Sequence, residues 1–182
     1  MNLEKLYNEF SAKMNDSYYV ELSKKEVLAV PLLIDIMLDD STSNSRWAET
    51  LLEKISAECP RIVYPYFQYI LQMFDKTDNF AVWNVWKIIS NLLVCDSENY
   101  WNDVRQKYFE ALKSVQITEF SIACDCADKV VASKPNELTC IAEILNNVEQ
   151  RDFYVAGEIS KASTDVAVEK AKIFFERIKI EG

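Results

Sequence analysis

Apolar side chains recur every three or four positions along most of the chain, which is the spacing of amphipathic helices. Residues 23–26 read Ser-Lys-Lys-Glu, a capping box that predicts a helix start. Polar stretches at 39–44 and 75–78 are typical of loops. The pattern predicts an all-α fold of about eight or nine helices, over residues 3–14, 23–38, 45–58, 61–74, 79–94, 100–115, 117–133, 136–147 and 164–180, with a further short helix expected at 153–160.

The scarcity of glycine supports this prediction. Only Gly157 and Gly182 occur among 182 residues, whereas the tight turns of β-rich domains usually need glycine at positive φ. Apolar residues make up 49% of the chain and charged residues 27%, which indicates a globular protein rather than a disordered one.

Internal repetition organises the predicted helices. Four apolar positions of the helix at 45–58 recur in two later helices, with a spacing of roughly one helix pair (48 to 85 to 123). The aligned positions are Ala48, Leu51, Leu52 and Ile55, then Val85, Ile88, Ile89 and Leu92, then Ala123, Cys126, Ala127 and Val130. One helix pair cannot bury its apolar face alone, so we expect the pairs to stack. A four-helix bundle, the alternative, predicts about four long helices.

The first repeat, residues 30–55, contains a family motif. The residues that carry it are Pro31, Asp39 or Asp40, Arg46 and Ala48. In these positions the segment resembles a HEAT repeat, and the resemblance covers roughly residues 24–145. The second unit keeps Pro65 and Asp75 but has Trp83 in place of the arginine, and the third has Ser121 there.

This resemblance implies a right-handed α–α superhelix of stacked antiparallel helix pairs, of the HEAT or armadillo-like type. The tetratricopeptide family is a rival, but its Trp, Gly and Tyr signature is missing. We predict one HEAT-like domain over residues 1–182, because no linker divides the chain. Its parts are an N-terminal cap helix at 1–22, three to four helix pairs at 23–148, and C-terminal helices or a cap at 149–182.

The charge and cysteine content bear on partners and location. A net charge of −9 argues against nucleic acid, which needs clustered Lys and Arg, and against an anionic membrane surface. Five cysteines, an odd number, favour a reducing compartment, and the N-terminal residues show no signal-peptide pattern. We therefore expect a cytoplasmic protein.

No catalytic constellation is found in the sequence. The chain has no histidine, the commonest general base, and its two glycines are too far apart for a phosphate-binding loop. Cys124 and Cys126 are the best metal candidates, but residues two apart on a helix point about 200° apart, with Cys126 toward the core and Cys124 outward. We expect no enzyme activity, no metal site and no cofactor.

A binding surface is the functional prediction. The resemblance implies that the second helix of each pair lines a concave surface, and the register places Trp86 outward among carboxylates. An indole within a rim of carboxylates suits a peptide hot spot or a cation. The alternative is that Trp83 and Trp86 pack against a neighbouring helix. The predicted binding residues are Arg46, Glu49, Glu53, Trp83, Trp86, Lys87, Asn91, Asp125 and Asp128.

The favoured function is thus a non-enzymatic scaffold that binds a protein or peptide, with basic segments as one option, through an acidic-aromatic concave surface. Two alternatives stay open. The first is an enzyme or enzyme subunit of the DNA-repair type, because some HEAT-like proteins act on alkylated DNA. A chain of net charge −9 lacks the basic groove that this work requires, which disfavours this alternative. A self-associating structural protein, formed by end-to-end stacking, is the other.

Overall fold

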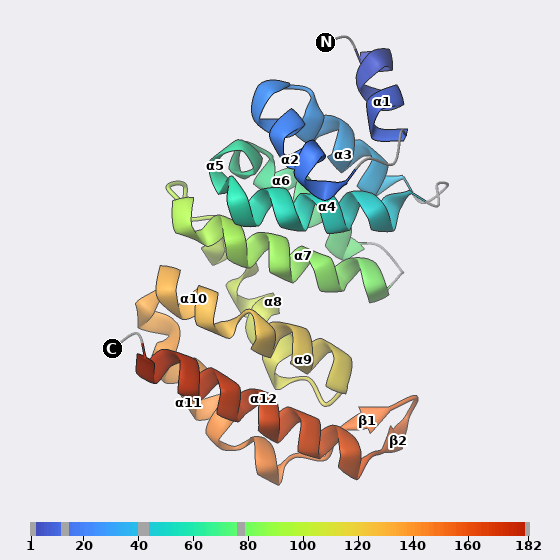
Figure 1. The fold of residues 1–182 in the computed structure, drawn as a ribbon. Helices are drawn as coiled ribbons and strands as arrows, with labels where there is room; N and C mark the ends of the chain where they lie inside the picture. The colour runs from blue at the N-terminus through green and yellow to red at the C-terminus, as the bar shows by residue number, and fades with distance from the viewer. Residues whose placement is uncertain (1–2, 12–14, 40–43, 76–78, 181–182) are drawn as a thin grey trace. The chain divides into compact units, whose positions relative to one another are not determined.

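The computed structural model describes residues 3–11, 15–39, 44–75 and 79–180, except for the side chains of Leu3, Tyr7, Ser11, residues 79–83 and Ile180. The fold is all-α, as predicted, with one small β-hairpin among the described residues (Figure 1). The chain divides into two compact units, Met1–Asp96 and Ser97–Gly182, which are described separately below. That the whole chain forms one domain stays a prediction.

In unit 1, α3 and α7 both pack against α4, the long helix at the centre of the unit (Figure 1). The predicted helix over 45–58 is confirmed to the residue as α4. The elements of unit 1 are α1 (Leu3–Ser11), α2 (Asp16–Lys25), α3 (Ala29–Leu38), α4 (Ser45–Glu58), α5 (Pro60–Val63), η1 (Tyr64–Tyr66), α6 (Phe67–Ile70), η2 (Leu71–Asp75), α7 (Asn79–Leu92) and η3 (Leu93–Cys95).

The predicted helix start at 23–26 is wrong. These residues lie at the end of α2, which begins after Asn15, whose side chain accepts a hydrogen bond from the Tyr18 N–H at 2.9 Å. Ser23 is buried in α2 instead of capping a helix. The next helix, α3, begins at Ala29, so Pro31 lies in its first turn, where the missing N–H is not needed.

The predicted continuous helix over 61–74 is also wrong, because it is broken into the short helices α5, η1, α6 and η2. Pro65 lies in the middle of η1. It has no N–H to donate to the preceding turn and its ring crowds the carbonyl four residues back, so a regular α-helix cannot run through it.

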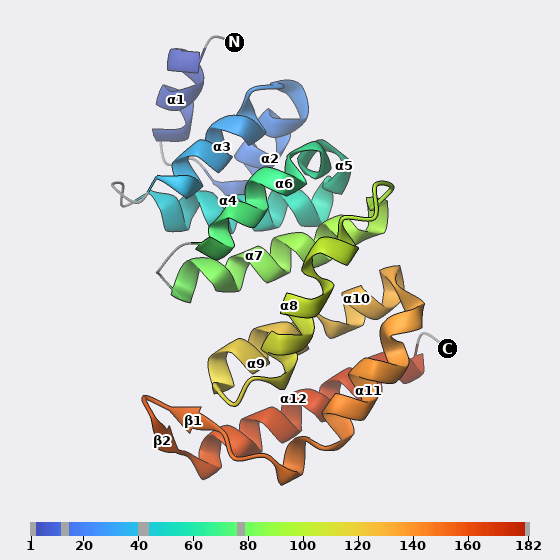
Figure 2. The same cartoon turned by 180° about the vertical axis from the view of Figure 1, so that it is seen from behind.

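In unit 2, α8 and α11 lie on one side and α9 and α12 on the other (Figures 1 and 2). The Tyr108 hydroxyl on α8 donates to the Ala123 carbonyl of α9 at 2.9 Å and ties the first pair together. The predicted helix over 117–133 is interrupted at Cys126. The elements are α8 (Trp101–Lys113), α9 (Ile117–Asp125), α10 (Ala127–Ser133), η4 (Pro135–Glu137), α11 (Leu138–Asn146), η5 (Val148–Gln150), β1 (Tyr154–Val155), β2 (Glu158–Ile159) and α12 (Lys161–Ile180).

The helix predicted at 153–160 is replaced by the hairpin β1–β2. Its turn residues Ala156 and Gly157 have φ of 51° and 86°. Positive φ at both central residues is what a tight turn that matches strand twist requires, and a helix excludes it. The hairpin is held to the loop between α8 and α9 through the Tyr154 N–H, which donates to the Val115 carbonyl at 2.8 Å.

The repeated apolar positions form the core of the helices that carry them. All four are buried in α4, all four in α7, and all four in the segment of α9, Cys126 and α10. The repeat in the sequence therefore corresponds to a repeated buried face. None of the described helices is both long enough and apolar enough to cross a bilayer.

Candidate functional site

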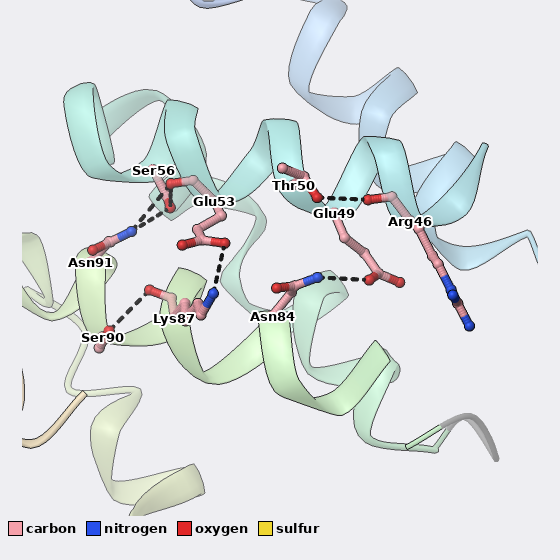
Figure 3. Close-up of polar contacts among 9 residues, drawn as sticks. All are labelled: Arg46, Glu49, Thr50, Glu53, Ser56, Asn84, Lys87, Ser90 and Asn91. Carbon is pink, nitrogen blue, oxygen red and sulfur yellow. Dashed lines mark hydrogen bonds and ion pairs between the residues drawn. The ribbon is translucent and has the colours of Figure 1, made fainter. Parts of the chain in front are cut away.

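Four of the predicted binding residues meet between α4 and α7 of unit 1 (Figure 3). The Asn84 amide donates to the Glu49 carboxylate at 3.1 Å, and Glu49 is only 2% exposed. Farther along, the Lys87 ammonium lies 3.4 Å from the Glu53 carboxylate. The two helices are thus joined by paired polar side chains, here called the α4–α7 seam.

The seam continues to the end of α4. The Asn91 side-chain amide, 9% exposed, donates to the Ser56 hydroxyl at 3.0 Å and to the Glu53 carbonyl at 3.2 Å. Ser56 itself donates to the Glu53 carbonyl at 2.7 Å and is fully buried. These donors are matched to acceptors of the chain itself, so this part of the seam holds helices together.

This geometry corrects the prediction of an open acidic surface on α4. Glu49 and Asn91 are buried, and Glu53 and Lys87 face each other. Arg46, in contrast, is exposed at the start of α4, and its carbonyl accepts a hydrogen bond from the Thr50 hydroxyl at 3.0 Å (Figure 3). The repeat in the sequence placed these residues in adjacent rows. It did not show that Glu49 and Asn91 are buried between α4 and α7.

Trp86, predicted to point outward, is buried with 4% of its surface exposed. Its ring centroid lies 4.8 Å from that of Phe74 in η2, so the indole packs against a neighbouring element. The alternative given for this indole is therefore the correct one. The side chain of Trp83 lies outside the described residues.

Asp125 and Asp128 belong to unit 2, where α12 provides their partners. The Lys170 ammonium lies 2.5 and 2.7 Å from the two oxygens of Asp125. The Arg177 guanidinium donates to Asp128 at 2.8 Å. The basic-partner prediction rested partly on these carboxylates, and both are neutralised by cations of the same unit.

Cys124 and Cys126, the metal candidates of the sequence, are both buried. Cys124, predicted to point outward, is buried beside α12, and burial raises the pKa of its thiol to about 12, with the Asp125 carboxylate adding to the effect. Such a thiol is protonated at neutral pH and is a poor nucleophile or ligand. Among the described residues no three His, Cys, Asp or Glu side chains are grouped as metal ligands.

Unit 2 has a groove of about 540 Å³ between α8 and α11. Its apolar part is formed by Phe109 and Ile144, and Cys140 is exposed within it. We call it the α8–α11 groove. Its lining residues are Arg105, Gln106, Phe109 and Lys113 of α8, Cys140, Glu143 and Ile144 of α11, and Asn147.

Arg105 of the groove lining is bonded to a buried carboxylate, Glu137. Glu137 accepts hydrogen bonds from Arg105 Nε at 2.6 Å, from Arg105 Nη2 at 2.8 Å and from Trp101 Nε1 at 2.9 Å. The Arg105 hydrogen bonds lower the pKa of Glu137, and the Trp101 bond acts in the same direction against partial burial. The Arg105 guanidinium also lies over the Phe109 ring, 4.9 Å from its centroid. This cluster fixes the start of α8 against the start of α11.

The groove residues were missed by the sequence analysis. A signal was present, since Arg105, Phe109 and Lys113 follow one another at intervals of four on one face of α8. What the sequence did not show is that α11 leaves this face partly uncovered.

Comparison with known protein families, curated proteins and solved structures gives no match.

Proposed function

We propose that this chain is a non-enzymatic interaction module, HEAT-like in architecture, that binds a short segment of a protein partner in the α8–α11 groove. The observation that carries the proposal is the groove itself: about 540 Å³, open to solvent, with Phe109 and Ile144 flanked by polar side chains. An apolar strip with a few oriented polar groups at its edges is the usual composition of a ligand site. A helix-lined groove of this kind suits the side chain of a peptide anchor.

The HEAT-like part of the proposal is supported by the repeated buried positions and by helix packing within each unit. In unit 1 the second helices α4 and α7 pack together, and in unit 2 α9 packs with α12. Helix pairs whose second helices contact in series are what a stack of HEAT-like repeats requires.

The proposed activity is binding without chemistry, in a reducing compartment such as the cytoplasm. The sequence contains no histidine, and the five cysteines are free thiols. The sequence predicted an acidic binding surface, but its carboxylates are paired with side chains of the same unit. We therefore place the binding surface on α8 and α11 instead.

A peptide-display selection on the intact chain tests the proposal. Enriched peptides are measured by fluorescence anisotropy against the wild type, against Ile144→Arg, which places a charged side chain in the groove, and against Val166→Arg. Val166 lies on α12 outside the groove lining and is 47% exposed, so this variant is a matched control. We expect Ile144→Arg to abolish binding and Val166→Arg to leave it unchanged.

A second readout uses Cys140, which is exposed in the groove. A bound peptide should slow alkylation of this thiol in proportion to occupancy. The absence of any enriched peptide would overturn the proposal, as would binding that survives Ile144→Arg and leaves Cys140 equally reactive.

A further inference from the structure

We infer that the α8–α11 groove selects a segment of mixed charge, in which an apolar anchor lies between one acidic and one basic side chain. This inference rests on the proposed function and specifies the partner for the same site. It depends on which charged side chains of the groove lining already form ion pairs within unit 2.

Arg105 is not available to a ligand as an unbalanced charge. Two of its nitrogens donate to the Glu137 carboxylate, at 2.6 and 2.8 Å, and its plane lies over Phe109. This bidentate pair neutralises the guanidinium and fixes its orientation. Arg105 therefore lines the groove with its charge already paired, and leaves recognition of charge to other residues.

Lys113 is the second cation of the lining, on the α8 side. No described carboxylate forms an ion pair with it. Its position is fixed by Arg151, whose guanidinium donates to the Leu112 carbonyl at 3.2 Å and to the Ser114 carbonyl at 2.5 Å. The backbone on both sides of Lys113 is therefore anchored, and its ammonium is presented at the end of α8.

Glu143 is the carboxylate of the lining, on the α11 side. Within the described ranges no cation pairs with its side chain; only its backbone carbonyl is engaged, by the Asn147 amide at 2.8 Å. The groove thus has a cation on the α8 side and a carboxylate on the α11 side, and the apolar side chains of Phe109 and Ile144 line it with them.

This arrangement favours one class of segment over two others. A purely apolar segment would cover Lys113 and Glu143 without replacing the hydrogen bonds that they form with water. Losing these hydrogen bonds is costly for charged groups. A segment with a single sign of charge would satisfy one side and be repelled by the other. A segment with an acidic side chain toward Lys113 and a basic one toward Glu143 satisfies both.

The test uses a peptide library in which a central Phe is fixed and the flanking positions vary among Ala, Glu and Lys. For the wild-type chain we expect enrichment of Glu on one side of the Phe and Lys on the other. In Lys113→Glu the preference for Glu should change to Lys, and in Glu143→Lys the preference for Lys should change to Glu. Each reversal should weaken the wild-type peptide about 3- to 10-fold, as expected for exposed charge pairs.

Lys172→Glu is the control, since Lys172 is exposed on α12, lies outside the groove lining and undergoes the same change of charge. It should alter neither preference. Suppose that Ile144→Arg still abolishes binding but the peptide preferences are unchanged in Lys113→Glu and Glu143→Lys. This result would overturn the present inference and leave the proposed function standing. A library from which nothing binds the wild type would overturn the proposed function as well.

Discussion

The α4–α7 seam of unit 1 and the α8–α11 groove of unit 2 are both formed by two facing helices with polar side chains, yet one is closed and the other open. In the seam, Asn84 and Asn91 donate directly across the contact to Glu49 and to Ser56. Among the described residues of the groove lining, Arg105 is bridged in this way, to Glu137, whereas Lys113 and Glu143 form no ion pair. Polar residues on a helix face therefore do not by themselves indicate a binding surface; what matters is whether the chain supplies their partners.

Because Trp86 is covered by a neighbouring element of unit 1, we predict that it stabilises the fold. Trp86→Ala removes a buried indole beside Phe74 and should lower the free energy of unfolding by about 3–5 kcal/mol. Urea titration followed by circular dichroism measures this without using the tryptophan signal. Tyr69→Ala, at a residue that is 57% exposed in the same unit, is the control and should cost less than about 0.5 kcal/mol. Equal effects of the two variants would show that α7 is not packed as described.

The Arg105–Glu137 pair beside the groove should give a pH-dependent contribution to stability. The pKa of Glu137 is lowered in the folded chain, chiefly by the Arg105 hydrogen bonds. A lowered folded pKa means that the contribution is present above the ordinary pKa of the carboxyl, 4.5, and is lost as pH falls through the folded value. Glu137→Gln should therefore destabilise the protein by about 1–3 kcal/mol at neutral pH, and by progressively less in acid.

Thermal melts between neutral and acidic pH check this prediction. Glu143→Gln removes a carboxyl from the same groove that is not bonded to Arg105, and it is the matched control. If Glu143→Gln reproduced the pH dependence of Glu137→Gln, the Arg105 bridge would not be its source.

Much of the helical architecture could be predicted from the sequence, because apolar periodicity reports directly on local structure. α4, α8 and α12 begin and end close to their predicted positions, and the repeated positions are buried. The hairpin was missed because it depends on positive φ at Ala156 as well as at Gly157, and alanine gives no such signal. The break at Cys126 likewise has no Pro or Gly to mark it.

The site could be predicted less well, for a physical reason. Periodicity gives the direction in which the Trp86 side chain points from its helix, but it does not show which other element packs against that side chain. η2 covers Trp86 through Phe74, whereas Phe109 of α8 lines an open groove. Coverage is a property of tertiary packing, and a pattern within one helix does not contain it.

A smaller effect is expected from the polar contacts of the seam. Asn91→Ala removes the hydrogen bonds to Ser56 and to the Glu53 carbonyl, and should lower the free energy of unfolding by about 1–2 kcal/mol. Gln72→Ala, at an exposed residue of the same unit, should change it by less than about 0.5 kcal/mol. Amide hydrogen exchange gives a second readout, since loosening of the seam should speed exchange in α4 and α7 together.

The smallest effect on stability should come from modifying Cys140 in the open groove. A thiol reagent compares this exposed cysteine directly with the buried Cys124. Iodoacetamide should modify Cys140 at least about 100-fold faster than Cys124, because Cys124 is buried and burial raises its pKa to about 12. The acetamide group at Cys140 should change the free energy of unfolding by less than about 0.5 kcal/mol, since it extends into space that the chain leaves unfilled. Peptide mapping by mass spectrometry measures both rates in one sample. Equal rates at the two cysteines would mean that α12 separates from α9 in solution, and a large loss of stability on modifying Cys140 would mean that the groove is part of the packed core.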